Sequence, residues 1–318
     1  MQRVPRETSF VPDVMTVLGP VPADALGTTL PHEHVFIDLM NEYKKEGVLN
    51  DARLAESELK KFVAIGGRSL VDCTSLELGR DPRALEAIAS ATGLNIVMGS
   101  GHYRDPYIDR DLMDRKGVAG LAKALIDEIE HGFEDSGIRP GIIGEVGSNR
   151  GWVSSTEERA LRVAAKAHLA TGLTIMTHAA RWPLGLPQLD VLCEVGVDPR
   201  CVIVGHCDMV PSMEYHEAIA ARGAFAEFDT IRGEQDYMTN RQVEYVVNLA
   251  RKGYLEQVLI SHDVCLTSLY TANGGKGYAF VTGPFVERLR AAGLTEDDVN
   301  TLIVDNPARA LTAASHLS

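Results

Sequence analysis

Two histidines, His32 and His34, lie two positions apart in the largely apolar segment TTLPHEHVFID, residues 28–38. Such a segment reads as a β-strand, in which side chains two positions apart project from the same face. Two neighbouring imidazoles are costly to bury unless partners satisfy their nitrogen atoms. A metal ion would satisfy both rings, so this pair predicts a metal site.

Further side chains of metal-binding types lie at or near the ends of later apolar segments. They are His102 in NIVMGSGHY, Glu145 in GIIGEVGS, His178 in LTIMTHAA, His206 in CVIVGHCD, Asp229 in AFAEFDT and Asp263 in VLISHD. Zinc and similar divalent ions bind imidazole nitrogens and carboxylate oxygens, and catalytic sites leave a position for water. Taken alone, each of these residues is more simply explained as a hydrogen-bonded core residue or, for Asp263, as a cap of the segment that follows. Their joint placement favours a centre for two ions.

The apolar segments that carry these residues form a regular repeat, and each is followed by a stretch of helical periodicity. Eight candidate strands cover residues 28–38, 69–75, 95–103, 141–148, 173–180, 201–208, 224–230 and 258–263. Eight strand-helix units are typical of a (β/α)8 TIM barrel, an α/β fold whose catalytic groups gather at the carboxyl ends of the strands. No linker or low-complexity segment divides the chain, so we expect a single domain over residues 1–318.

The overall composition limits the classes of partner. Lys and Arg number 31 against 44 Asp and Glu, and this net charge of -13 argues against nucleic acid or an anionic membrane as the partner. Five scattered cysteines without a CxxC spacing favour a reducing compartment, and neither a signal-like apolar segment nor a membrane span is evident. We therefore expect a cytoplasmic protein that acts on a small-molecule substrate, while a homodimer stays open.

Seven separate segments carry a second signal: TVLGPVPADALGTTLPHEH, IIGEVGSN, TIMTHAA, IVGHCD, VLISHD, GGKGYAF and VDNPARAL. In this order they resemble the phosphotriesterase family of the amidohydrolase superfamily, over nearly the whole chain from about Thr16 to Leu311. The resemblance implies a distorted, amidohydrolase-like TIM barrel with a centre of two divalent ions. Zinc is the expected metal, with Mn²⁺, Co²⁺ or Fe²⁺ as alternatives.

The resemblance also implies a position for each ligand. The more buried ion would be held by His32, His34 and Asp263, the more exposed ion by His178 and His206, and both by Glu145 and a bridging hydroxide. Many family members bridge the ions with a carboxylated lysine, whereas this chain resembles the glutamate-bridged, phosphotriesterase-related branch. Either bridge supplies one negative charge through two oxygens, so the charge of the centre is preserved. Because glutamate is shorter, substrate preferences of lysine-bridged relatives do not transfer.

The chemistry that this resemblance implies is hydrolysis. Two ions lower the pKa of a bridging water and polarise a C=O or P=O bond, and Asp263 would carry the proton to the leaving group. A carboxylic ester or lactone is the favoured substrate, with amides of N-acyl compounds and phosphotriesters as alternatives. Other classes stay open: a barrel that binds small molecules without catalysis, and a metal-dependent aldolase or isomerase.

Residues outside the ligand set have weaker assignments. Tyr103, in GSGHYRDPY, resembles a tyrosine that lactonase-like relatives place beside the substrate oxygen, or is an ordinary loop aromatic. Arg232, in FDTIRGEQD, would meet either an anionic substrate group or a surface carboxylate. Asp229 is a candidate acceptor that orients a metal-bound imidazole.

Other ionisable residues are expected to take no part in the metal centre. Glu33 and His262 should face away from the ligands beside them in the strand. Four histidines in helical or terminal segments are expected to be exposed: His131, His168, His216 and His316. The Gly-containing segment 266–278 is expected to form a loop that shapes the pocket.

Overall fold

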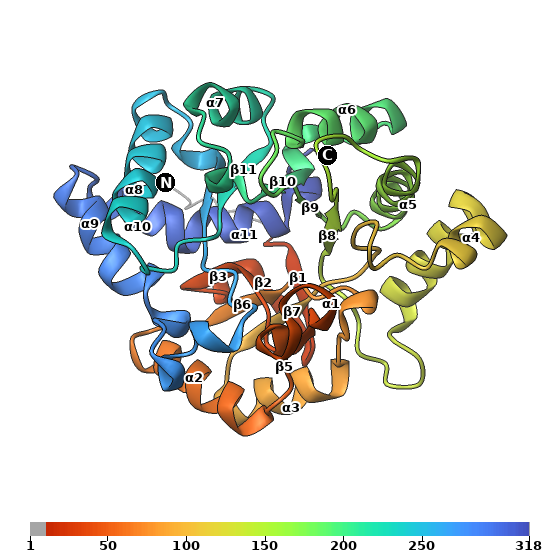
Figure 1. The fold of residues 1–318 in the computed structure, drawn as a ribbon, viewed down its shortest axis with the longest axis horizontal. Coiled ribbons are helices and arrows are strands. Elements are labelled where there is room, and N and C mark those ends of the chain that lie inside the picture. The colour runs from red at the N-terminus through yellow and green to blue at the C-terminus, as the bar shows by residue number, and fades with distance from the viewer. Residues whose placement is uncertain (1–10, 318) are drawn as a thin grey trace, which may run out of the picture.

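Eight parallel strands form the wall of a barrel in the computed structural model, which describes residues 11–317 (Figure 1). These strands are β3 (Thr29–Glu33), β6 (Ser69–Asp72), β7 (Asn95–Met98), β8 (Ile143–Gly147), β9 (Ile175–His178), β10 (Val202–Gly205), β11 (Phe225–Phe228) and β12 (Val258–Ile260). One sheet has the order β12-β11-β10-β9-β8 and the other the order β3-β6-β7. Each strand lies within one of the eight predicted segments, which confirms the predicted TIM barrel.

The two sheets meet at two irregular seams. At the seam between β12 and β3, the amide of Asp263 donates to the carbonyl of His32 at 3.2 Å, and the amide of His32 donates to Ser261 Oγ at 3.1 Å. At the seam between β7 and β8, the amide of Gly141 donates to the carbonyl of Met98 at 2.9 Å. Because these few bonds replace regular strand ladders, the barrel is distorted.

Helices surround the strands on the outside (Figure 1). They are α1 (Met40–Tyr43), α2 (Ala52–Ala64), α3 (Pro82–Thr92), α4 (Arg110–His131), α5 (Ser155–Thr171), α6 (Gly185–Val195), α7 (Met213–Ala221), α8 (Asp236–Arg251), α9 (Val286–Ala291), α10 (Glu296–Asn300) and α11 (Asn306–Leu311). Several begin at a side chain that accepts hydrogen bonds from the first free amides, as Asp51 does for α2 and Ser154 for α5. These caps fix where the chain turns from each loop into its helix.

An amino-terminal hairpin closes one end of the barrel. It consists of β1 (Asp13–Thr16) and β2 (Gly19–Pro22), which pair antiparallel, and the amide of Val17 reaches the carbonyl of Ile96 in β7. Val14 and Leu26 pack with the inward-facing apolar side chains of the strands, which are Val71, Val97, Ile142, Met176, Ile203, Phe225 and Leu259. This apolar layer forms a dry floor beneath the polar strand ends. A second short hairpin joins β4 (Ile37–Asp38) to β5 (Val48–Leu49).

No helix within residues 11–317 is long and apolar enough to cross a membrane. Residues 1–10, where we expect no signal sequence, lie outside the described residues. The single domain over residues 1–318 stays a prediction.

The loop after β12 is held by a buried carboxylate on α2. Glu58 accepts hydrogen bonds from the amides of Thr271 and Ala272, at 2.9 and 3.1 Å, and from Lys61 Nζ at 2.7 Å. Burial opposes the charge of Glu58, but these donors outweigh burial and lower its pKa below the usual value of 4.5. The charged form therefore stabilises the folded protein above that value, and the stabilisation disappears as the pH falls through the lower folded pKa.

We expect Glu58→Gln to lower the free energy of unfolding at pH 7 by about 1–3 kcal/mol, because it weakens charge-assisted hydrogen bonds. The difference from the parent protein should shrink as the pH falls below 4.5, where Glu58 loses its charge in the unfolded state first. Denaturant unfolding at pH 7 and pH 4 measures both values. Glu56→Gln is the control, since Glu56 lies on the same helix and pairs with the exposed Lys60. A difference that grows at low pH would contradict the assignment.

Candidate metal centre and its cavity

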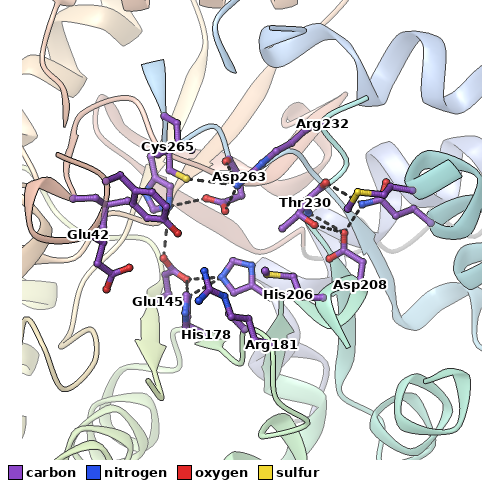
Figure 2. Close-up of a pocket in the computed structure, with 18 of the residues that line it drawn as sticks. Glu42, Glu145, His178, Arg181, His206, Asp208, Thr230, Arg232, Asp263 and Cys265 are labelled. Atoms are coloured by element: carbon purple, nitrogen blue, oxygen red, sulfur yellow. Dashed lines mark hydrogen bonds and ion pairs between the residues drawn. The ribbon is translucent and has the colours of Figure 1, made fainter. Parts of the chain in front are cut away.

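One carboxylate faces four imidazoles at the carboxyl ends of the strands. Glu145 Oε2 lies 2.8 Å from His178 Nδ1, 3.2 Å from His206 Nε2 and 3.7 Å from His32 Nε2. Its other oxygen, Oε1, lies 3.6 Å from His34 Nε2. Figure 2 shows Glu145, His178 and His206 pointing toward one another. The barrel thus brings together side chains that are up to 174 positions apart, since β3, β8, β9 and β10 end at the same rim.

Asp263, three positions after the end of β12, lies beside this cluster. Its Oδ1 lies 3.3 Å from His34 Nε2, and its Oδ2 accepts a hydrogen bond of 2.7 Å from Arg232 Nη2. Asp263 and His206 both have left-handed backbones, with φ of 53° and 59°, which is uncommon for residues other than glycine. This conformation turns the chain sharply where the strand ends.

The donor atoms form overlapping groups of a size that suits metal ions. His32, His34 and Glu145 make one group, and Glu145, His178 and His206 make another, with the donor atoms of each group within 4.8 Å of one another. Both groups share Glu145, so the cluster is positioned for two ions with a common carboxylate. The imidazole and carboxylate donors match the preferences of zinc and related divalent ions.

Buried carboxylates orient two of the imidazoles from outside the cluster. His32 Nδ1 lies 2.9 Å from Glu227 Oε2 and 3.1 Å from Asp229 Oδ2. Asp229 also accepts from the Nδ1 and the amide of His206, at 2.7 and 2.8 Å. These contacts leave Nε2 of both rings directed at Glu145, and His32 Nε2 is buried without a hydrogen-bond partner among the described residues. An orphaned buried nitrogen in this position fits a metal ligand.

The protonation states of the cluster follow from burial and mutual contact. Burial opposes charge on Glu145, but His178 and His206 hold its pKa well below the usual range. Burial and the neighbouring His206 lower the pKa of His178 to about 4, so this ring is neutral near pH 7. Despite burial, Asp229 and Glu145 raise the pKa of His206 to about 10. An ion bound by His206 would therefore displace a proton, whereas His178 is ready to bind.

The cluster lies at the bottom of a cavity of about 790 Å³. Both predicted substrate-binding residues line this cavity. Tyr103 is buried, and its hydroxyl lies 3.2 Å from His178 Nδ1. Arg232 does not meet a surface carboxylate: its partner is the buried Asp263, and it also donates to the carbonyls of His262 and Asp263, at 3.1 and 2.9 Å. The backbone of the segment after β12 and the Asp263 carboxylate already bind this guanidinium.

The structure agrees with the expected exclusion of Glu33 from the metal centre. Glu33 turns away from the cavity and accepts hydrogen bonds from Ser261, from His262 and from the amide of Val264. His102, which the sequence placed among the side chains of metal-binding types at the strand ends, instead pairs with Glu77 at 2.5 Å and belongs to none of the donor groups. Both contacts are structural.

Two of the four histidines expected to be exposed are buried. His168 contacts the carbonyl of Leu173 at 2.8 Å, and His216 contacts the carbonyl of Cys207 at 2.8 Å. Both rings lie on the inner faces of helices α5 and α7, which pack against the strands. The prediction that these two histidines are exposed because they lie in helical segments was therefore wrong. His131 and His316 are exposed as expected.

Glu227 and Thr74 were not predicted from the sequence, although Glu227 orients His32 and Thr74 Oγ1 lies 2.9 Å from His34 Nδ1. For Glu227 a signal exists, because Glu227 and Asp229 are two positions apart at the end of a strand, as His32 and His34 are. Thr74 carries no comparable signal.

Comparison with known proteins decides the family. Residues 12–311 match the model of the phosphotriesterase family. The chain belongs to this family. Among phosphotriesterase-family proteins, the phosphotriesterase homology protein of Escherichia coli K12 is 33% identical over 291 residues, which cover 90% of this chain and 98% of that protein. N-acetyltaurine hydrolase of Dictyostelium discoideum is 27% identical over 372 residues, with 96% and 99% covered.

Solved structures of the phosphotriesterase family agree with the barrel described above. A resiniferatoxin-binding protein from Rhodobacter sphaeroides superimposes with a TM-score of 0.87 at 34% identity, covering 95% of both chains. The predicted family and fold are therefore confirmed, and this chain is a hydrolase-family protein with a cluster positioned for metal binding.

Proposed function

We propose that the protein is a hydrolase with two divalent metal ions that cleaves carboxylic esters or lactones. The observation that carries this proposal is Glu145 shared between two groups of donors at the bottom of a cavity. In the proposed arrangement His32, His34 and Asp263 would hold one ion and His178 and His206 the other, with Glu145 available to both. The expected metal is zinc. When bound, such ions lower the pKa of water and polarise the bond to be cleaved.

The protein's own residues would orient the substrate and move the proton. Asp263 has one oxygen directed at His34 and the other held by Arg232, so its position is fixed while the first oxygen can accept a proton. The Tyr103 hydroxyl, beside His178 and inside the cavity, can donate a hydrogen bond to a substrate oxygen. Burial raises the pKa of Tyr103 well above its usual value, so the hydroxyl keeps its proton at neutral pH.

Amides of N-acyl compounds are the second candidate. The relative from Dictyostelium discoideum is named for hydrolysis of N-acetyltaurine and covers nearly the whole chain. Phosphotriesters are the third candidate substrates, and the name of the family is the support for them. The name of the resiniferatoxin-binding neighbour supports a different class, in which the barrel binds a small molecule without turnover.

We expect the purified protein, loaded with zinc, to carry about two metal ions per chain and to hydrolyse lactones and aryl esters faster than N-acyl amino acids or phosphotriesters. Tyr103→Phe should lower kcat/KM for the preferred ester about 10- to 100-fold, since it removes one donor from a buried site. Metal analysis and a screen of the four substrate classes measure these outcomes. Tyr254→Phe, a tyrosine outside the cavity, is the control. Tight substrate binding without turnover in metal-replete protein would contradict the proposal.

A further inference from the structure

Four arginines line the cavity: Arg104, Arg181, Arg232 and Arg241. Two of them already have acidic partners. Arg104 donates to Glu42 and stacks over the ring of Tyr103 at 4.8 Å, and Arg232 donates to Asp263. Their positive charges are therefore compensated within the protein.

The other two arginines, Arg181 and Arg241, have no acidic partner among the described residues. Within residues 11–317, neither Arg181 nor Arg241 makes a hydrogen bond or an ion pair through its side chain. Two carboxylates of the cavity lining, Asp208 and Glu234, form no ion pair with either arginine among the described residues, and Asp208 Oδ2 instead accepts from Thr230 and Gln242. Arg181 and Arg241 thus line the cavity without an ion pair to a carboxylate.

Arg181 is the better placed of the two. It lies three positions after His178 in the loop that follows β9, and it lines the same cavity as His178 and His206 (Figure 2). Its φ is 67°, so its backbone is left-handed like those of His206 and Asp263, and three of the five described non-glycine residues with positive φ line this cavity. Such conformations are costly and cluster at functional sites. Arg241, on the exposed face of α8, has no such constraint.

We propose that Arg181 binds an anionic group of the substrate, a carboxylate or sulfonate, separate from the bond that is cleaved. The proposal rests on the hydrolase function proposed above. A guanidinium presents a planar fork of donors that matches the oxygens of such a group. Because Arg181 lies three positions after His178 and lines the same cavity, an anion held there would position the rest of the substrate over the donor cluster. The substrate class would then be charged esters or lactones rather than neutral ones.

The test compares pairs of γ-lactones that differ only in charge: one lactone carries a carboxylate or a sulfonate, and its partner carries the matching neutral amide. In the zinc-loaded protein, the ratio of kcat/KM for the charged lactone to that for the neutral lactone should fall about 10- to 100-fold in Arg181→Met, because a charge-assisted hydrogen bond is lost. Arg181→Lys should restore part of the ratio. Of the carboxylate and sulfonate pairs, the one with the larger loss identifies the preferred anion.

Arg115→Met is the matched control, since Arg115 is also an exposed arginine but lies on α4 outside the cavity. Its ratio should equal that of the parent protein. Equal losses on the charged and neutral lactones in Arg181→Met would overturn the assignment of Arg181 and leave the hydrolase proposal standing.

A second measurement separates the two proposals. Calorimetry with 3-oxocyclopentane-1-carboxylate, which has no bond to hydrolyse, should give a dissociation constant about 10-fold or more higher in Arg181→Met than in the parent protein. If no lactone or ester is turned over but this difference is found, the hydrolase proposal fails and the anion site stands. An unchanged dissociation constant in Arg181→Met would overturn the anion site.

Discussion

Replacement of Glu145 by glutamine is expected to remove most of the bound metal and to lower kcat/KM more than about 100-fold, the upper limit for residues that only orient a metal ligand. Glu145 is the carboxylate common to both donor groups, and it faces His178 and His206 at 2.8 and 3.2 Å. Glutamine removes a negative charge from between the two proposed ions and presents an NH₂ group that cannot bind them. Metal content per chain and kcat/KM measure the outcome.

Glu77→Gln is the matched control for this substitution. Glu77 also pairs with a histidine at the rim, His102, but lies outside the donor groups. This variant should keep its metal. Two ions per chain together with full activity in Glu145→Gln would rule out Glu145 as the shared ligand.

For Asp263→Asn we expect hydrolysis to fall about 10²- to 10⁴-fold, the range for loss of a general acid or base. The amide oxygen of asparagine can still accept from Arg232, but the NH₂ group facing His34 cannot accept a proton. Metal loss should be smaller than in Glu145→Gln, because Asp263 would bind only one of the two proposed ions. Single-turnover kinetics at saturating zinc measure the chemical step apart from metal affinity.

The control for Asp263→Asn is Asp190→Asn. Asp190 also pairs with an arginine, Arg222, at 2.6 Å, but on the exposed outer surface of the barrel. Its variant should retain activity. If Asp263→Asn hydrolyses the preferred ester at the parental rate, Asp263 does not transfer the proton.

The sequence contains enough information to predict the barrel because its strands are buried on both faces and are therefore rich in apolar side chains. All eight of these strands lie in the predicted segments, although each is shorter than predicted. The hairpin of β1 and β2 could not be recognised in the same way. Its second strand contains Pro20 and Pro22, which remove backbone donors, and its residues alternate between intermediate and exposed positions.

The donor cluster could be predicted for a topological reason. The carboxyl ends of the strands of a parallel barrel meet at one rim. The position of a polar residue at the end of a strand is therefore predictable, even when the residues that it contacts are distant in the chain. The position of a side chain in a loop cannot be predicted in this way. Arg181 faces the cavity because of its backbone conformation, and Arg232 meets Asp263 because of the path of two loops, and neither path is encoded in a local pattern.

Val14 and Leu26 form the apolar floor together with the side chains inside the strands, and this floor lies apart from the polar rim. Stability and substrate recognition therefore depend on different parts of the barrel. Stability resides in this floor and in the helices around it, whereas the charge and shape that meet a substrate belong to loops at the opposite rim. Evolution can therefore exchange loops, and with them the compounds that are accepted, without endangering folding. Proteins that share this scaffold are expected to diverge first in loop residues such as Arg181 and last in the floor.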